Sequence, residues 1–157
     1  MGLDIGDRRV GVALSDESAS LAQGLCVIRR SRLDRDLAEV VRLAGVQGVG
    51  SIVAGLPRRL RGDLGPQAEK VLAFVGALRQ AAPVPVELWD ERLTTRIAEG
   101  ALRAGGVSRD RRRSLVDQVA ACVILQGFLD ARAASRSRAA DRAGDPGAAL
   151  GGVAPLP

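Results

Sequence analysis

A charged residue inside a strand pattern near the N-terminus constrains this chain more than any other feature. Residues 3–16 read as a short strand, a tight turn at Gly6-Asp7 and a second strand. Gly-Asp suits a hairpin corner because glycine tolerates positive φ without steric cost. Asp4 lies between two apolar residues of the first strand, where a charge is costly unless something compensates it. Asp4 is therefore a strand-end carboxylate facing solvent, a hydrogen-bonded partner of the turn, or a ligand of a bound cation.

The pattern after this hairpin predicts alternating strands and helices. Ser31 is expected to cap the first helix, with Asp34 three residues later in a capping-box relation. The order of elements predicts a mixed five-stranded α/β sheet, an antiparallel three-strand meander beside two parallel strands, flanked by helices. The first strand is expected at its centre. Further strands are expected over residues 23–30, 51–56 and 86–91, and helices over 33–44, 66–81, 94–104 and 108–132.

One domain is expected to account for most of the chain. The length of 157 residues suits a single domain of ordinary size. From residue 133 onward the composition is dominated by Ala, Arg, Ser, Gly and Pro, without a sustained apolar period. We therefore expect a folded domain over residues 1–132 and a disordered C-terminal tail over residues 133–157.

The residue types that are missing narrow the chemistry. The chain has no His and no Tyr, which excludes imidazole bases, His-ligated zinc and a phosphotyrosine intermediate. Its two cysteines cannot form a zinc finger, and Lys70 is not preceded by the glycine loop of a P-loop. Chemistry must therefore rest on carboxylates, arginines, hydroxyls, backbone amides and bound metal. The net charge of +5 favours nucleic acid or another polyanion as the partner.

A loop rich in glycine and arginine follows the fourth expected strand. It contains Arg58, Arg59, Arg61 and Gly62, just before the start of a helix. Glycines let backbone amides approach an anion, and a helix N-terminus adds positive potential. The loop is therefore either a contact for a phosphodiester backbone or a solvated connection.

Two further acidic positions are candidates to join Asp4. Glu91 and Arg92 close the last strand, where they suit a metal ligand and a phosphate contact, or else a surface salt bridge or helix cap. Asp117 lies in a helix that is nearly apolar all round and is therefore expected to be buried. A carboxylate in such a helix needs either a structural arginine or a cation shared with Asp4.

These three acids predict a metal site. Asp4, Glu91 and Asp117 are far apart in sequence but can converge at one edge of the expected sheet. Ligation by oxygen alone selects a hard ion, Mg²⁺ or Mn²⁺. One or two such ions can activate water and hold the leaving oxygen during phosphodiester hydrolysis, so no histidine base is required.

Four blocks of the sequence resemble the YqgF/RuvX family, in the family's order and up to about residue 132. They are Asp4-x-Gly6-x-x-Arg9-Val10-Gly11-x-Ala13-x-Ser15-Asp16, Gly55-Leu56-Pro57 with Gly62 and Gly65, Asp90-Glu91-Arg92-Leu93-Thr94-Thr95, and Asp117-x-x-Ala120-Ala121-x-x-Ile124-Leu125. The resemblance implies an RNase H-like fold and a divalent-metal nuclease that resolves Holliday junctions or matures the 5′ end of pre-16S rRNA. It also implies catalytic, metal-binding roles for Asp4, Glu91 and Asp117. The nucleic-acid contacts that it implies are Arg9, Arg58, Arg59, Arg61, Gly62 and Arg92.

Two other functions are compatible with parts of this pattern. A non-catalytic nucleic-acid-binding module of the same fold would use its acids structurally. The Asp-x-Gly hairpin also opens ATPases of the actin and sugar-kinase fold, but those need two such domains and 157 residues hold one.

Assembly and location are expectations as well. A resolvase that cuts two strands of a symmetric junction is expected to form a homodimer, although the sequence shows no clear dimer interface. The chain begins directly in a strand pattern, with neither a leader nor an apolar run of membrane length. We therefore expect a cytoplasmic protein.

Overall fold

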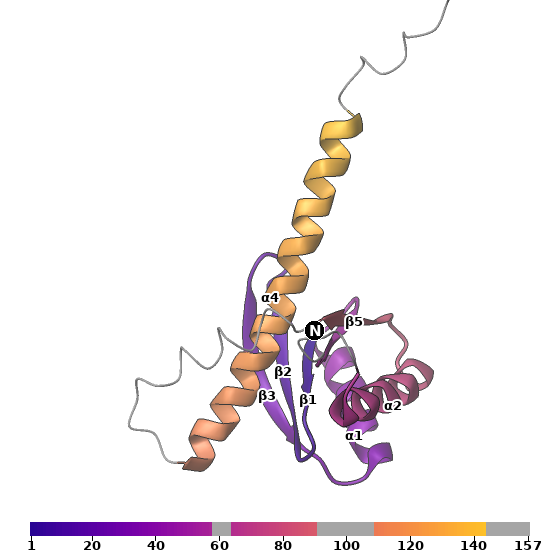
Figure 1. Cartoon of the computed structure of the whole chain (residues 1–157), viewed down its shortest axis with the longest axis vertical. Helices are drawn as coiled ribbons and strands as arrows, with labels where there is room; N and C mark the ends of the chain where they lie inside the picture. The colour runs from indigo at the N-terminus through magenta and orange to yellow at the C-terminus, as the bar shows by residue number, and fades with distance from the viewer. Residues whose placement is uncertain (58–63, 91–108, 144–157) are drawn as a thin grey trace, which may run out of the picture.

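One mixed sheet of five strands organises the part of the chain that the structure describes, residues 1–57, 64–90 and 109–143 (Figure 1). This computed structural model places the strands in the order β3-β2-β1-β4-β5. β1 is antiparallel to β2, and β2 to β3, whereas β4 is parallel to both β1 and β5. The predicted meander, parallel strands and central first strand are confirmed. The strands are β1 (Gly2–Ile5), β2 (Arg9–Ser15), β3 (Ala22–Arg29), β4 (Ile52–Leu56) and β5 (Val86–Asp90).

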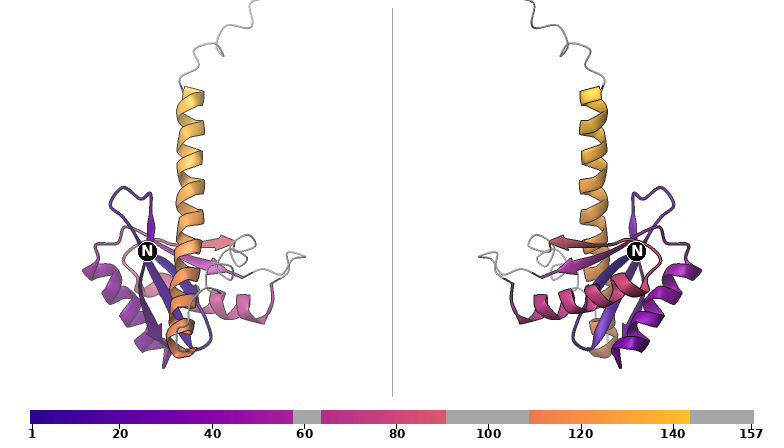
Figure 2. Two further views of the ribbon diagram at one scale, coloured as in Figure 1. Left: turned by 90° about the vertical axis from the view of Figure 1, so that its left-hand side faces the viewer. Right: turned by 90° about the vertical axis from the view of Figure 1, so that its right-hand side faces the viewer.

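Three described helices cover the two faces of the sheet (Figure 2). α1 (Leu33–Val46) and α2 (Pro66–Ala81) pack on one face, and α4 (Arg109–Ala143) crosses the other. Pro66 suits the first position of α2 because its ring fixes a helical φ. Within the described ranges, no helix combines the length and the apolar character that a membrane span requires.

The face of the sheet under α1 and α2 carries the bulky side chains. Successive residues of a strand point to opposite faces, so alternate positions of β1 and β2 face these helices. Leu3, Ile5, Val10 and Val12 are buried there against Phe74 of α2. This core fixes the position of β1 between the two halves of the sheet.

The face under α4 is flat because small residues line it. A Cβ added to Gly2 would lie 2.7 Å from the Cβ of Leu125 in α4. A Cβ added to Gly11 would clash with the carbonyl oxygen of Asp117. Ala13, also on this face, is fully buried. The small residues therefore let the backbone of α4 approach the sheet closely.

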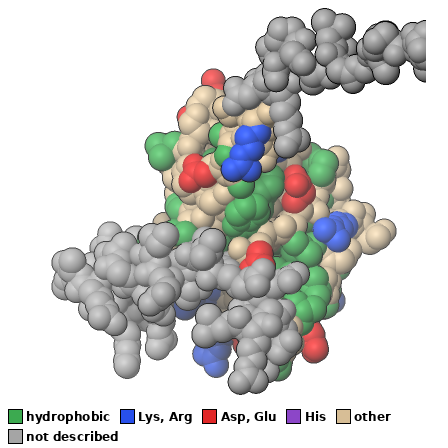
Figure 3. Space-filling view, turned by 45° about the horizontal axis from the view of Figure 1, so that its top comes forward, with side chains coloured by type: hydrophobic (Ala, Val, Ile, Leu, Met, Phe, Trp, Pro, Cys, Tyr) green, Lys and Arg blue, Asp and Glu red, His purple; other side chains and the backbone are tan. Residues whose placement is uncertain are grey.

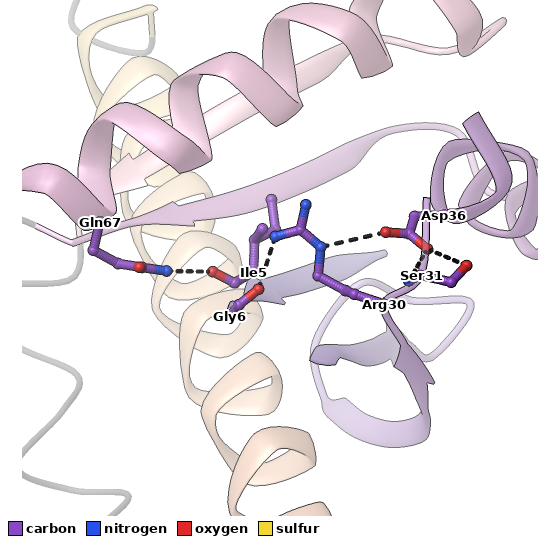
Figure 4. Close-up of polar contacts among 6 residues, drawn as sticks. All are labelled: Ile5, Gly6, Arg30, Ser31, Asp36 and Gln67. Carbon is purple, nitrogen blue, oxygen red and sulfur yellow. Dashed lines mark hydrogen bonds and ion pairs between the residues drawn. The ribbon is translucent and has the colours of Figure 1, made fainter. Parts of the chain in front are cut away.

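A polar network fixes the turn between β1 and β2 (Figure 4). Arg30 Nη1 donates to the carbonyl oxygen of Gly6 at 2.9 Å, and Arg30 Nε donates to the carboxylate of Asp36 at 3.3 Å. Asp36 is only 3% exposed. Gln67 Nε2 donates to the carbonyl oxygen of Ile5 at 3.1 Å. These bonds connect the carboxyl end of β1 to α1 and α2.

Two local predictions near this turn are wrong. α1 has no side-chain cap at its N-terminus, so Ser31 and Asp34 do not form a capping box. The backbone N–H of Ser31 instead donates to Asp36 at 2.9 Å. Gly6 does not take a positive φ. Space rather than φ favours glycine there, because a Cβ would lie 3.0 Å from the carbonyl oxygen of Arg9.

The last helix extends further than the sequence predicted. α4 continues to Ala143, past the expected end near residue 132 (Figure 1). Ala and Arg are good helix formers, and a helix already nucleated by packing extends readily. The expected disorder of residues 133–143 is therefore corrected, while the domain boundary at residue 132 stays a prediction. The expected helix over residues 94–104 and the segment after residue 143 lie outside the described residues.

Candidate active site

Asp4 is the charged exception on the flat face of β1. Alternation places it on the same face as Gly2, and its register partner in β2 is Gly11. The side chain is half-buried and has neither a hydrogen-bond donor nor a cationic partner among the described residues. Burial, followed by repulsion from Asp117, raises the pKa of Asp4 to about 6.

Asp117 reaches the same place from α4. The helix crosses β2 at Gly11, where the backbone of Asp117 lies against the glycine. Because Gly11 is opposite Asp4 in the sheet, the two acids come from neighbouring positions of strand and helix. They are close enough for the negative charge of Asp117 to raise the pKa of Asp4.

Arg9 holds the carboxylate of Asp117. Its Nε donates to Oδ2 of Asp117 at 2.5 Å, and the two side chains are 32% and 22% exposed, respectively. The sequence left two partners open for Asp117, an arginine or a cation shared with Asp4. The structure contains the arginine and places the second acid nearby. The nucleic-acid contact predicted for Arg9 stays a prediction.

The other predicted site residues lie outside the described residues. The structure describes the strands that lead to them. β4 ends at Leu56 and β5 at Asp90, which are register partners, and both strands run parallel to β1. Trp89 packs edge-on against Phe128 of α4, with ring centroids 5.8 Å apart, so β5 is tied to the helix that carries Asp117. The residues without a described position are Arg58, Arg59, Arg61, Gly62, Glu91 and Arg92.

The two described acids fit a divalent cation. Asp4 is a half-buried carboxylate whose charge no described residue neutralises, and Asp117 uses Oδ2 for Arg9. Carboxylate oxygens are the ligands that Mg²⁺ and Mn²⁺ prefer. Between them, the described residues contain no group of three His, Cys, Asp or Glu side chains that could hold a metal. A third protein ligand would therefore come from outside the described ranges.

Several supporting residues were not predicted. A glycine inside a strand often marks a point where another backbone approaches closely. The strand pattern around Gly11 could therefore have identified it as a contact point for a helix. The ion pair of Arg9 with Asp117 joins residues that are 108 positions apart, and no local pattern reveals it. The same is true of Arg30 and Gln67, which bind backbone oxygens at the end of β1.

Comparison with known proteins gives consistent matches over the described fold. The sequence model of the RuvX family, described as a Holliday junction resolvase, matches residues 1–131. A protein of Symbiobacterium thermophilum named "Putative pre-16S rRNA nuclease" is 52% identical over 133 residues, which cover 85% of this chain and 92% of the relative. A protein of the same name from Desulforudis audaxviator is 47% identical over 137 residues, which cover 87% of this chain and 97% of the relative.

A solved structure shares the architecture at much lower identity. Thermus thermophilus RuvC in complex with a Holliday junction substrate superposes with a TM-score of 0.51 at 18% identity, covering 85% of this chain and 94% of that one. At this identity the likeness concerns the fold alone, and it identifies the mixed sheet with its flanking helices as RNase H-like.

Proposed function

The chain belongs to the RuvX family and is a nuclease, and from this premise we propose that it hydrolyses phosphodiester bonds of structured nucleic acid with Mg²⁺ or Mn²⁺ bound at Asp4 and Asp117. The observation that carries the proposal is the pair of neighbouring acids. The pKa of Asp4 is raised partly by Asp117, and no described residue neutralises Asp4. A cation between the two carboxylates would remove that repulsion.

The residues of the chain have distinct tasks in this proposal. Asp4 and Asp117 would hold the metal, which when bound would activate water and stabilise the negative charge of the phosphate. Arg9 keeps the carboxylate of Asp117 in one orientation and leaves Oδ1 for the metal. Asp4 must lose its proton to become a ligand, so metal binding competes with protonation at pH values below about 6.

Glu91 is proposed as the third ligand. It directly follows β5, the parallel strand that ends at the same sheet edge as β4. Arg58, Arg59, Arg61, Gly62 and Arg92 are proposed as phosphate contacts, since guanidinium groups and glycine amides suit phosphate oxygens.

A precursor of 16S rRNA is the substrate that we propose first. The relatives that are 52% and 47% identical are named as nucleases of pre-16S rRNA, whereas the family description names the Holliday junction. Cleavage of the precursor and of a four-way DNA junction by one preparation, with the same metal, separates the two substrates. A junction-specific enzyme would also be expected to form a homodimer, which sedimentation would detect.

Substitution of the acids tests the nuclease mechanism. Asp4→Asn, Glu91→Gln and Asp117→Asn should each lower Mn²⁺-dependent cleavage at least about 100-fold, because each removes a metal ligand. Substrate binding should be retained or become tighter, since negative charge near the phosphate is lost. The matched control is Asp34→Asn, which neutralises an exposed acid on α1, on the other face of the sheet.

The result distinguishes the other functions as well. Wild-type binding without any cleavage would favour a non-catalytic nucleic-acid-binding module. ATP hydrolysis that depends on Asp4 would favour an ATPase of the actin and sugar-kinase fold. Full cleavage by all three variants would refute the metal site proposed here.

A further inference from the structure

The C-terminal part of α4 extends beyond the body of the protein. Figure 1 shows the helix continuing past the sheet as a single projecting rod. Leu129 is the last buried residue of α4, and residues 132–139 are all exposed. The match to the RuvX family ends at residue 131. The projecting segment, residues 132–143, lies beyond the residues that the family model matches, and we call it the arginine arm.

The arginine arm is strongly basic, and the three of its arginines whose side chains are described have no acidic partner among the described residues. It contains four arginines and one aspartate. Among the described residues, no carboxylate forms an ion pair with Arg132, Arg136 or Arg138. In Figure 3, which turns the end from which α4 projects toward the viewer, Lys and Arg side chains lie on the surface together with Asp and Glu side chains. Of these three arginines, Arg132 alone has a ring contact, over Phe128 at 5.8 Å.

The arginines lie on one side of the helix. At 3.6 residues per turn, Arg132, Arg136 and Arg138 fall within about 160° of the helix circumference. The opposite side carries Ala133, Ala134 and other small residues. The segment has no large apolar side chain with which to anchor a protein partner or a membrane. A one-sided row of guanidinium groups matches an extended polyanion.

The arm is rigidly connected to the candidate active site. Asp117 and Arg136 belong to the same uninterrupted helix. With a rise of 1.5 Å per residue, the middle of the arm lies roughly 30 Å from Asp117 along the helix axis. At 3.4 Å per base-pair step, that distance corresponds to about nine base pairs of duplex.

We propose that the arginine arm binds the phosphodiester backbone of the nucleic-acid substrate at a position remote from the cleaved bond. The arm would hold the flanking duplex while Asp4 and Asp117 act on the phosphate at the other end of α4. This proposal rests on the proposed function, because it places nucleic acid at the neighbouring acids.

The test compares two charge-removing variants in the Asp4→Asn background, in which binding is measured without cleavage. Fluorescence anisotropy with a junction or RNA duplex of about 20 base pairs per arm gives the dissociation constant at several salt concentrations. The double variant Arg136→Gln with Arg138→Gln should weaken binding about tenfold. It should also reduce the magnitude of the slope of log K against log salt concentration by about one to two. The matched control is Arg35→Gln, an exposed arginine of α1 on the other face of the sheet, which should change binding less than twofold.

Substrate length supplies the second part of the test. A substrate with arms of about six base pairs is too short to reach from Asp117 to the arm, so the double variant should bind it as tightly as its parent does. Unchanged affinity and salt dependence on the long substrate, or an equal loss on both substrates, would overturn the proposal. Wild-type cleavage in the same preparation is read separately. Its absence would count against the proposed function, whereas the arm is judged from binding alone.

Discussion

At the scale of single residues, Asp4 is the position where the fold and the chemistry of the side chain conflict most. The pKa of its carboxyl is raised from 3.8 to about 6, first by burial and then by repulsion from Asp117. The folded protein therefore binds this proton more tightly than the unfolded chain does. Stability must fall as the pH rises from about 4 to about 6, by up to about 3 kcal/mol. A site that binds metal explains why a fold would keep such a residue.

Replacing Asp4 by Asn should therefore stabilise the metal-free protein at neutral pH. With metal chelated, we expect the free energy of unfolding of Asp4→Asn to exceed that of the wild type by about 2 kcal/mol at pH 7.5. The difference should shrink to a few tenths of a kcal/mol near pH 4, where Asp4 is protonated in the folded protein. Urea unfolding across this pH range measures both values.

Addition of Mg²⁺ or Mn²⁺ supplies the control for this prediction. The metal should stabilise the wild type and leave Asp4→Asn nearly unchanged, because the variant lacks one ligand. A difference between the two proteins that does not depend on pH would show that the Asp4 carboxyl is not perturbed in the folded state.

The acids could be identified from the sequence because each one conflicts with its surroundings. Asp4 stands in a strand pattern and Asp117 in an apolar helix, and such conflicts are visible without a structure. The partner of Asp117 could not be identified in this way. Arg9 is one of many arginines, and only the close packing of α4 against β2 brings it to Asp117.

At the scale of elements, the contact between α4 and β2 decides whether the two acids meet. Gly11 provides the space for this contact, since the backbone of Asp117 occupies the position that a Cβ at residue 11 would need. We expect Gly11→Ala to lower the free energy of unfolding by about 3 kcal/mol, because helix or strand must move. The shift would separate Asp117 from Asp4, so cleavage should fall even under conditions where the protein stays folded. Urea unfolding and a cleavage assay with Mn²⁺ measure the two effects.

Gly76→Ala is the matched control for this prediction. Gly76 lies in the middle of α2, and a Cβ there would meet nothing within 4 Å. Alanine favours a helix over glycine, so this variant should be as stable as the wild type or more stable by up to about 1 kcal/mol. Equal stability of the two variants would mean that α4 does not approach β2 as closely as described.

The elements themselves were predictable where periodicity and breakers agree. Pro66 opens α2 as expected, and β4 is the continuous apolar strand that its composition indicates. The capping box was wrong because Asp36, two residues beyond Asp34, accepts the hydrogen bond of Ser31 and also binds Arg30. Both Asp36 contacts depend on the position of the β3 end relative to α1, which is a tertiary property.

At the scale of the whole molecule, the structure combines a packed domain with a helix that leaves it. Leu129 is the last buried residue of the described chain, and α4 continues to Ala143, with residues 132–139 all exposed. The sequence showed where apolar periodicity stops, near residue 132, but not that the helix continues. Apolar periodicity arises where one face of a helix packs against a core. An exposed helix of Ala and Arg has no such face, so its sequence shows no apolar period.

The domain boundary expected at residue 132 leads to the last prediction. A chain of residues 1–132 keeps every buried side chain of the described core, and the residues 133–139 that it lacks are all exposed. Its free energy of unfolding should therefore stay within about 0.5 kcal/mol of the full chain, with an unchanged urea dependence. Cleavage of a substrate with short arms should also be retained, because Asp4, Glu91 and Asp117 are all present. A large loss of stability would mean that residues 133–157 belong to the folding unit, and the arginine arm would then have a structural role in addition to any contact with nucleic acid.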